Sequence, residues 1–268
     1  MSLIRTERLS VALCADRVGL IWRIGHAGEQ SQVLTTSRAD TARDGMPALD
    51  ALQGWLADAK PRKLRLSVTL SAGLVRYALI PWPGSNLTQT EDAAWLRLQF
   101  EALHGDMTGW RIQSDPGGYG RARVACAVPE ATLARLRDMG RANRLKTQAI
   151  VPYFVHCWNR WRRGGTKPAG LFGVSESDRV VWASYGPAGW AGLRTGIARA
   201  GIVEMPQLAQ RERVLQGQTD GAPFHLHVAG HNAHASAAAA DGTHIRWLTS
   251  KATDEPDAIA MARLLAAP

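Results

Sequence analysis

Alternating apolar and polar positions open the chain and predict a three-stranded meander. The runs "LSVALCA" (9–15), "RVGLIWRI" (17–24) and "SQVLTTS" (31–37) have the composition of strands, and short polar turns separate them. Residues 44–59 then repeat their apolar positions at helical spacing, and "LRLSVTLS" (64–71) is again strand-like. The beginning of the chain therefore predicts a β-β-β-α-β series.

Residues 72–128 interrupt that series and predict an inserted subdomain. They hold a strand at 72–82, a helix at 88–105 and two further strands around the turn "DPGGYG". A helix–strand–helix stretch over 129–163 then returns to the main series, and "GGTKP" at 164–168 is typical of a linker.

The second half of the chain begins as the first half does. "ADRVGLIW" (15–22) and "SDRVVWAS" (177–184) share a small residue, Asp-Arg-Val and an apolar run that reaches a Trp. The elements predicted after the second hairpin alternate between helix and strand: helices at about 188–200 and 205–216, strands at 224–230 and 243–249, and a helix at 255–267. We therefore predict a duplicated α/β fold with one lobe over residues 1–165 and a shorter one over 166–268.

The net charge of +9 lies in the first half of the chain. Residues 1–165 hold 23 Lys and Arg against 14 Asp and Glu, whereas residues 166–268 hold nine of each. Such an excess attracts an acidic partner, a nucleic acid or an anionic membrane surface, although ordinary arginine usage also accounts for it.

The cysteines and the apolar runs indicate a cellular compartment. Cys14, Cys126 and Cys157 are widely spaced and form no CxxC pair, which favours a reducing environment. The first residues do not resemble a secretory signal, and no stretch approaches 18 uncharged apolar residues. We expect a cytoplasmic protein.

No motif in the sequence assembles a catalytic site. G-x-S-x-G, H-E-x-x-H and the P-loop pattern are absent, and the glycine-rich "GGYGRARV" (117–124) lacks the following helix that a phosphate cradle needs. We therefore predict no catalytic residues and no cofactor.

Two residue clusters could bind a ligand but have plainer explanations. His225, His227, His231 and His234 could hold a metal, but no Cys lies near them and Asp220 and Asp241 only flank them, so solvent-facing histidines and no metal site are predicted. In "FVHCWNRWRR" (154–163) the Trp and Arg residues could stack on bases and hold phosphates. A helix that buries its Trp face and solvates its Arg face explains the same pattern better.

The duplicated lobe with a hairpin at the start of each copy resembles the actin/Hsp70/sugar-kinase superfold. Within it, the chain is similar to the type IV pilus assembly protein PilM and the cytoplasmic domain of the type II secretion protein GspL. The segments that carry the resemblance are "VALCADRVGLIWR", "LSVTLSAGLVRYALIPWPG", "LRLQFEALHG", "RVACAVPEATLARLRDMGRANRL", "PAGLFGVSESDRVVWASYG" and "DAIAMARLLA". It implies a reduced fourth subdomain, formed by the helices predicted around 188–216.

The phosphate-binding turns depart from those of active members of the superfold. An Asp-x-Gly turn is expected in each hairpin, but Leu13–Arg17 and Val174–Asp178 contain no glycine, and Glu176 with Asp178 would repel a triphosphate. The adenosine-binding turn keeps only Gly230. The resemblance therefore implies a degenerate nucleotide site in a protein that is not an enzyme.

The function implied by the resemblance is that of a cytoplasmic scaffold for a type IV pilus or related secretion machine. Such a protein binds the N-terminal cytoplasmic tail of a single-span inner-membrane protein, contacts the motor ATPase and stays peripheral to the membrane. Two alternatives remain open at this point: an active ATPase or kinase with altered loops, and a nucleic-acid-binding module that uses the basic half.

One residue is predicted to contact the partner. In the resembled family the tail lies in a groove between the first lobe and its inserted subdomain. Trp82 stands beside the Pro81–Pro83 turn, where a Trp can keep one face open as an anchor. The competing interpretation is that Trp82 caps the core of the subdomain.

Overall fold

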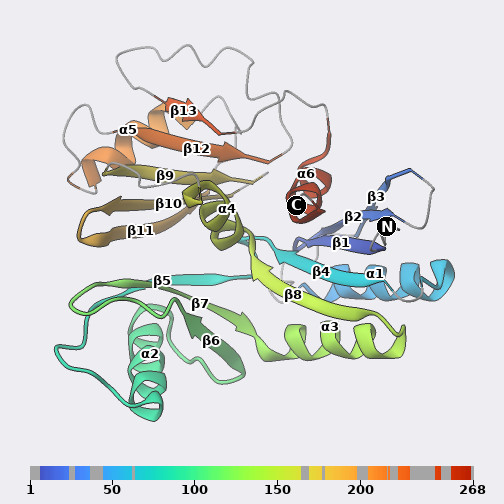
Figure 1. Cartoon of the computed structure of the whole chain (residues 1–268), viewed down its shortest axis with the longest axis horizontal. Coiled ribbons are helices and arrows are strands. Elements are labelled where there is room, and N and C mark those ends of the chain that lie inside the picture. The colour runs from blue at the N-terminus through green and yellow to red at the C-terminus, as the bar shows by residue number, and fades with distance from the viewer. Residues whose placement is uncertain are drawn as a thin grey trace, which may run out of the picture.

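The protein is built from two five-stranded sheets and a smaller three-stranded sheet (Figure 1). The computed structural model describes residues 7–23, 28–36, 45–61, 64–163, 169–176, 179–197, 205–215, 217, 223–229, 245–248 and 255–266. The predicted linker at 164–168 lies outside these residues.

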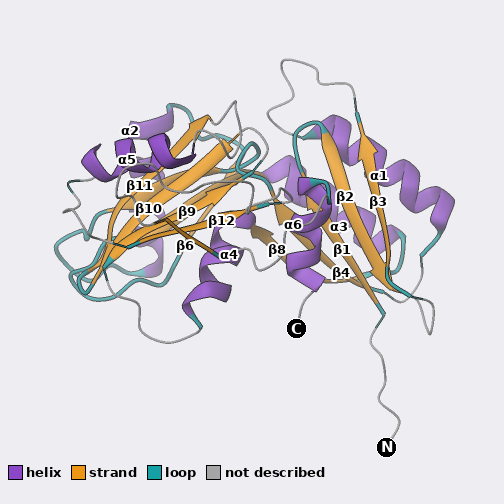
Figure 2. Cartoon of the chain, turned by 90° about the horizontal axis from the view of Figure 1, so that it is seen from above, coloured by secondary structure: helices purple, strands orange, loops and turns teal. Residues whose placement is uncertain are grey.

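The first sheet has the strand order β3-β2-β1-β4-β8 and is covered on both faces. Its strands are β1 (Arg8–Leu13), β2 (Arg17–Arg23), β3 (Gln30–Thr35), β4 (Arg65–Leu70) and β8 (Lys146–Pro152). Helices α1 (Met46–Ala59) and α3 (Glu130–Ala142) pack on one face. Helix α6 (Asp257–Ala266) comes from the other end of the chain and packs on β1, β2 and β4 from the opposite face (Figure 2).

The second sheet repeats this layout with the order β11-β10-β9-β12-β13. Its strands are β9 (Gly170–Ser175), β10 (Arg179–Gly186), β11 (Gly189–Ile197), β12 (Phe224–Val228) and β13 (Ile245–Trp247). In both sheets the first three strands form an antiparallel meander, and the other two lie parallel to the first strand of that meander. This repetition confirms the predicted duplicated fold class, whereas the exact lobe boundaries stay a prediction.

The register of the two sheets also agrees residue by residue. Leu13 pairs with Val18 in the first hairpin, and Ser175 pairs with Val180 in the second. Leu13 also lies opposite Leu70 of β4, as Ser175 lies opposite Val228 of β12. The two hairpins are therefore equivalent elements of a repeated unit.

One predicted helix is a strand. Residues 188–200 were expected to be helical, but Gly189–Ile197 form β11, the third strand of the second meander. Glycines at 189, 192 and 196 disfavour a helix, and the open edge of β10 supplies backbone partners for an extended chain. Of the two helices assigned to a reduced fourth subdomain, only α5 (Met205–Leu215) is present in the described residues.

The inserted subdomain has its own small core. Strands β5 (Arg76–Ile80), β7 (Arg123–Pro129) and β6 (Trp110–Ser114) form an antiparallel sheet in that order, and α2 (Gln89–His104) packs on it. Seven buried residues fill the space between them: Ala78, Ile80, Leu96, Phe100, Met107, Ala125 and Ala127. The subdomain can therefore hold a surface site on a rigid frame.

Helix α4 (Tyr153–Arg162) lies between the lobes and carries the Trp and Arg cluster. The rings of Trp158 and Trp190 are 4.2 Å apart, and Trp161 stacks on Phe172 of β9 at 5.1 Å. Trp158 and Trp161 are half-buried against the core, while Arg160, Arg162 and Arg163 stay exposed. The structure therefore agrees with a helix that packs its Trp face inward and solvates its Arg face.

The histidines of β12 face this aromatic cluster rather than solvent. His225 is only 5% exposed, and its Nδ1 lies 3.2 Å from the Tyr185 hydroxyl. Nε2 of His227 lies 2.8 Å from the Tyr153 hydroxyl. The prediction of solvent-facing histidines is therefore wrong for His225, because its strand is central and both of its faces are covered.

Candidate functional site

The two hairpin turns that would hold nucleotide phosphates in this fold are closed in the same way. The Cys14 N–H donates to the Arg17 carbonyl at 3.0 Å, and the Glu176 N–H donates to the Arg179 carbonyl at 2.8 Å. Cys14 and Glu176 therefore hold equivalent positions, one in each lobe. Asp178 lies outside the described residues, so the equivalence of Asp178 and Asp16 that the shared Asp-Arg-Val pattern suggests stays a prediction.

Glu176 crosses from the second lobe to the end of β4 in the first. The Ala72 N–H donates to both carboxylate oxygens of Glu176 at 3.0 Å, and the Ser71 hydroxyl donates to one of them. Glu176 is 5% exposed, so this carboxylate is buried between the lobes. The sequence indicated that Glu176 would repel a triphosphate, but it could not reveal its partners, which lie 104 and 105 positions away.

The first-lobe turn lies beside a second buried acid. Arg17 contacts Asp257 at the beginning of α6 at 3.6 Å and Asp16 at 3.4 Å. Burial, followed by the negative charges of Glu176 and Asp257, raises the pKa of the Cys14 thiol well above its usual value. Burial therefore favours the neutral thiol form of Cys14.

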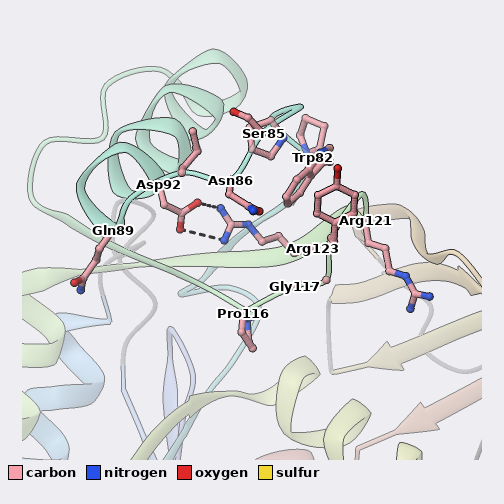
Figure 3. A pocket seen from close by; sticks show the side chains of 14 residues that line it. Trp82, Ser85, Asn86, Gln89, Asp92, Pro116, Gly117, Arg121 and Arg123 are labelled. Atoms are coloured by element: carbon pink, nitrogen blue, oxygen red, sulfur yellow. Dashed lines mark hydrogen bonds and ion pairs between the residues drawn. The ribbon is translucent and has the colours of Figure 1, made fainter.

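A pocket of about 410 Å³ opens on the inserted subdomain (Figure 3). The loop before α2 and the loop between β6 and β7 form most of its wall. The lining residues are Pro81, Trp82, Pro83, Ser85, Asn86, Leu87, Gln89, Asp92, Pro116, Gly117, Gly118, Tyr119, Arg121 and Arg123. The glycine-rich segment 117–124, which lacks the helix that a phosphate-binding loop needs, thus contributes one wall of this pocket.

A helix cap fixes the edge of this pocket. The Thr88 hydroxyl accepts from the Glu91 N–H at 3.3 Å, and the Thr88 N–H donates to the Glu91 carboxylate at 2.8 Å, which makes a capping box. The first turn of α2 then directs Asp92 towards Arg123, and the two form an ion pair across the pocket wall (Figure 3). The capping box fixes the start of α2, and the ion pair joins α2 to β7 on the other side of the pocket.

Trp82 lines this pocket instead of the subdomain core. It is half-buried, and its ring centroid lies 5.0 Å from that of Tyr119, which is 81% exposed. The packed core between α2 and the small sheet does not include Trp82. Two aromatic rings beside prolines can hold an apolar side chain, and the Arg121 side chain at the rim can pair with an acidic neighbour (Figure 3).

Neither region contains a recognisable metal site. Within the described part of the chain, no group of three or more His, Cys, Asp or Glu residues could hold a metal ion. His231 and His234 lie outside that part, so the prediction for the full histidine cluster stays open.

Solved structures share the fold of the whole chain at low sequence identity. The cytoplasmic domain of EpsL, an inner-membrane component of the type II secretion system of Vibrio cholerae, is 13% identical with a TM-score of 0.60, and the match covers 98% of this chain and 96% of that one. The PilM–PilN type IV pilus biogenesis complex gives 14% identity and a TM-score of 0.62, with 98% of each chain covered.

A third structure extends the same likeness. A Bacteroides thetaiotaomicron protein with an actin-like ATPase fold and unknown function is 11% identical with a TM-score of 0.58, covering 98% of this chain and 97% of that one. No family model and no curated protein matches the chain. The fold is therefore actin-like, as predicted, and it is shared with PilM and with the GspL-type domain.

A helix that spans a membrane needs about 20 mostly apolar residues. Among the described residues, none of the helices is long and apolar enough to cross a bilayer.

Proposed function

We propose that this chain is a non-enzymatic assembly protein of a type II secretion or type IV pilus machine. It acts at the cytoplasmic face of the inner membrane, where it binds the cytoplasmic tail of a membrane-anchored partner and contacts the motor ATPase. The observation that carries the proposal is the full-length match to both the EpsL cytoplasmic domain and the PilM–PilN complex, since two assembly proteins of related machines use this same arrangement of lobes and insertion.

The geometry of the two hairpin turns supports a role without nucleotide. Both phosphate turns lack glycine, and Glu176 places a buried carboxylate between the lobes. A triphosphate brought to the same place would meet this negative charge at close range. We therefore expect calorimetry with magnesium and ATP to give no saturable heat, and micromolar binding would support the ATPase alternative instead.

The pocket at Trp82 is the proposed anchor site for the tail. Aromatic residues at the centre of an interface often contribute most of the binding free energy, and Trp82 with Tyr119 offers such a surface. The tail that fits has an apolar anchor residue with an acidic residue beside it, which pairs with Arg121.

The experiment is a pull-down and titration with the cytoplasmic tail peptide of a candidate single-span inner-membrane partner. Trp82→Ala should weaken binding by about tenfold to a hundredfold, because it removes one central aromatic contact. Leu98→Ala on α2 is the matched control, since Leu98 is 57% exposed and does not line the pocket. Unchanged binding by Trp82→Ala would exclude the pocket, and a large fall in melting temperature would instead make Trp82 structural.

A further inference from the structure

The turn after β4 directs hydrogen-bond donors at the carboxylate of Glu176. Besides the bonds from Ala72 and Ser71 to the Glu176 carboxylate, the Gly73 N–H donates to the Ser71 hydroxyl oxygen at 3.2 Å. This last bond orients the hydroxyl so that its proton faces the carboxylate. A backbone N–H group and a hydroxyl that converge on a pair of oxygens form the kind of donor site that binds anions.

The site is closed to solvent. Ser71 is 6% exposed and Ala72 is 3% exposed, matching the burial of Glu176 itself. A charge held away from water costs stability unless donors compensate it, so the carboxylate and the turn depend on one another. Because the acid comes from the second lobe and the donors from the first, this mutual dependence joins the lobes.

The position of the acid is not imposed by the fold. The equivalent turn of the first lobe carries Cys14, and both turns close with the same backbone hydrogen bond. A hairpin of this shape therefore forms without a carboxylate at this position. The hydrogen bonds between the lobes therefore depend on the Glu176 side chain and not on the shape of the turn.

We propose that residues 71–73 form an oxyanion-binding site and that its resident ligand is the carboxylate of Glu176. The protein's own side chain occupies the site and clamps the two lobes without a bound ligand. When the carboxylate is removed, the same donors accept a small free oxyanion such as inorganic phosphate or acetate. This inference is independent of tail binding, which takes place on the inserted subdomain.

Chemical rescue of Glu176→Ala tests the site. In chloride buffer the melting temperature should fall by about 5 °C, since charge-assisted bonds are lost and the donors are left buried. Phosphate at tens of millimolar should restore at least half of that loss by mass action, compared with chloride of equal ionic strength. Hydrogen exchange at the Ala72 amide should accelerate in the variant and slow again in phosphate.

Two further variants serve as controls. Leu226→Ala also destabilises the second lobe, but it removes a fully buried apolar side chain and leaves no anion-binding donors behind, so phosphate should not rescue it. The double variant Ser71→Ala/Glu176→Ala lacks the hydroxyl donor and should lose most of the rescue.

Several results would overturn the proposal. They are an unchanged melting temperature for Glu176→Ala, equal recovery in chloride and phosphate, or equal phosphate rescue of Leu226→Ala. If Glu176→Ala does not fold, Glu176→Gln keeps the size of the side chain and removes its charge. Exchange at the Ala72 amide should then be faster than in the unmodified protein, and unchanged exchange would contradict the site.

Discussion

At one cross-strand position of the hairpin, the first lobe pairs Val11 with Leu20, and the second lobe pairs Gly173 with Trp182. Val11 is fully buried and Trp182 is 1% exposed, so both pairs belong to cores. In the second lobe, nearly all of the side-chain volume at this position comes from Trp182 on β10. Strand order and register thus survive in both lobes while the packing that fills them differs.

The end of each sheet differs in charge. In the first lobe Arg8 lies opposite Arg23 on one side and Arg65 on the other, and Arg65 lies opposite Lys146. All four are exposed, and like charges directly opposite one another destabilise a sheet.

The described positions of the corresponding row in the second lobe carry no charged side chain. By the same register, Gly170 lies opposite Tyr185, and the residue that precedes β12 is Pro223. The strand arrangement therefore does not require the four basic residues of this row. The lobes share a backbone plan and have acquired separate surface properties.

The core pair should give the largest effect. Gly173→Val places a side chain into the Trp182 ring, and Trp182→Leu leaves a cavity, so each change should cost about 3 kcal/mol of unfolding free energy. The double variant copies the first-lobe pair and should cost less than the sum by more than about 1 kcal/mol. Urea unfolding of all four proteins measures this coupling. If the double variant loses as much unfolding free energy as the two single variants together, the side-chain volumes of the two paired residues do not compensate for one another.

Acid should destabilise the second lobe through a buried histidine that the first lobe lacks at the equivalent position. Burial, and then the positive charges of His156 and Arg160, lowers the pKa of His227 to about 4, whereas the equivalent position of β4 is Thr69. Unfolding raises this pKa towards about 6.5, so the neutral folded form loses stability as the pH falls from 6.5 towards 4. The loss at pH 4.5 should be about 2–3 kcal/mol.

The matched variant for this prediction is His227→Gln, which keeps an acceptor for the Tyr153 hydroxyl. Its unfolding free energy should change less between pH 7.5 and 4.5 than that of the unmodified protein, by about 2 kcal/mol. Equal pH dependence of the two proteins would mean that His227 does not titrate in this range.

The basic row should give the smallest effect and one of opposite sign. Arg8→Thr should stabilise the protein by about 0.5 kcal/mol at low salt, because it removes repulsion from two neighbouring strands. The gain should shrink at high salt as the charges are screened. Arg111→Thr on β6, opposite the apolar Val128, is the control and should change little. Destabilisation by Arg8→Thr would show that the row is held by compensating contacts.

The sequence revealed the repeated hairpins and the insertion because both depend on local patterns. Asp-Arg-Val marks the turn in each half, and the alternating strands around it have period two. Strand β11 was missed because Gly, Ala and Arg give no clear period; its identity depends on the open edge of β10. The repeat itself could have corrected this, since the first lobe begins with three strands.

The sites were less visible than the fold. Trp82 could be selected from its Pro-flanked turn, but the opposite wall at Gly117–Tyr119 is joined to it only by the folding of the insertion. The partners of Glu176 lie in another lobe, and no sequence periodicity links positions so far apart. Contacts made across lobes are therefore the part that sequence patterns leave undetermined.

Helix α6 has a consequence for the synthesis of this protein. It is the last element described, yet it covers β1, β2 and β4, where Gly19 leaves the space that Ala258 occupies. At ordinary translation rates, roughly ten to forty seconds separate the emergence of β4 from that of α6. During this interval an apolar face of the first sheet stays uncovered on the ribosome. A trigger-factor type of chaperone should therefore bind nascent chains that end between β4 and α6 and release them once the helix docks.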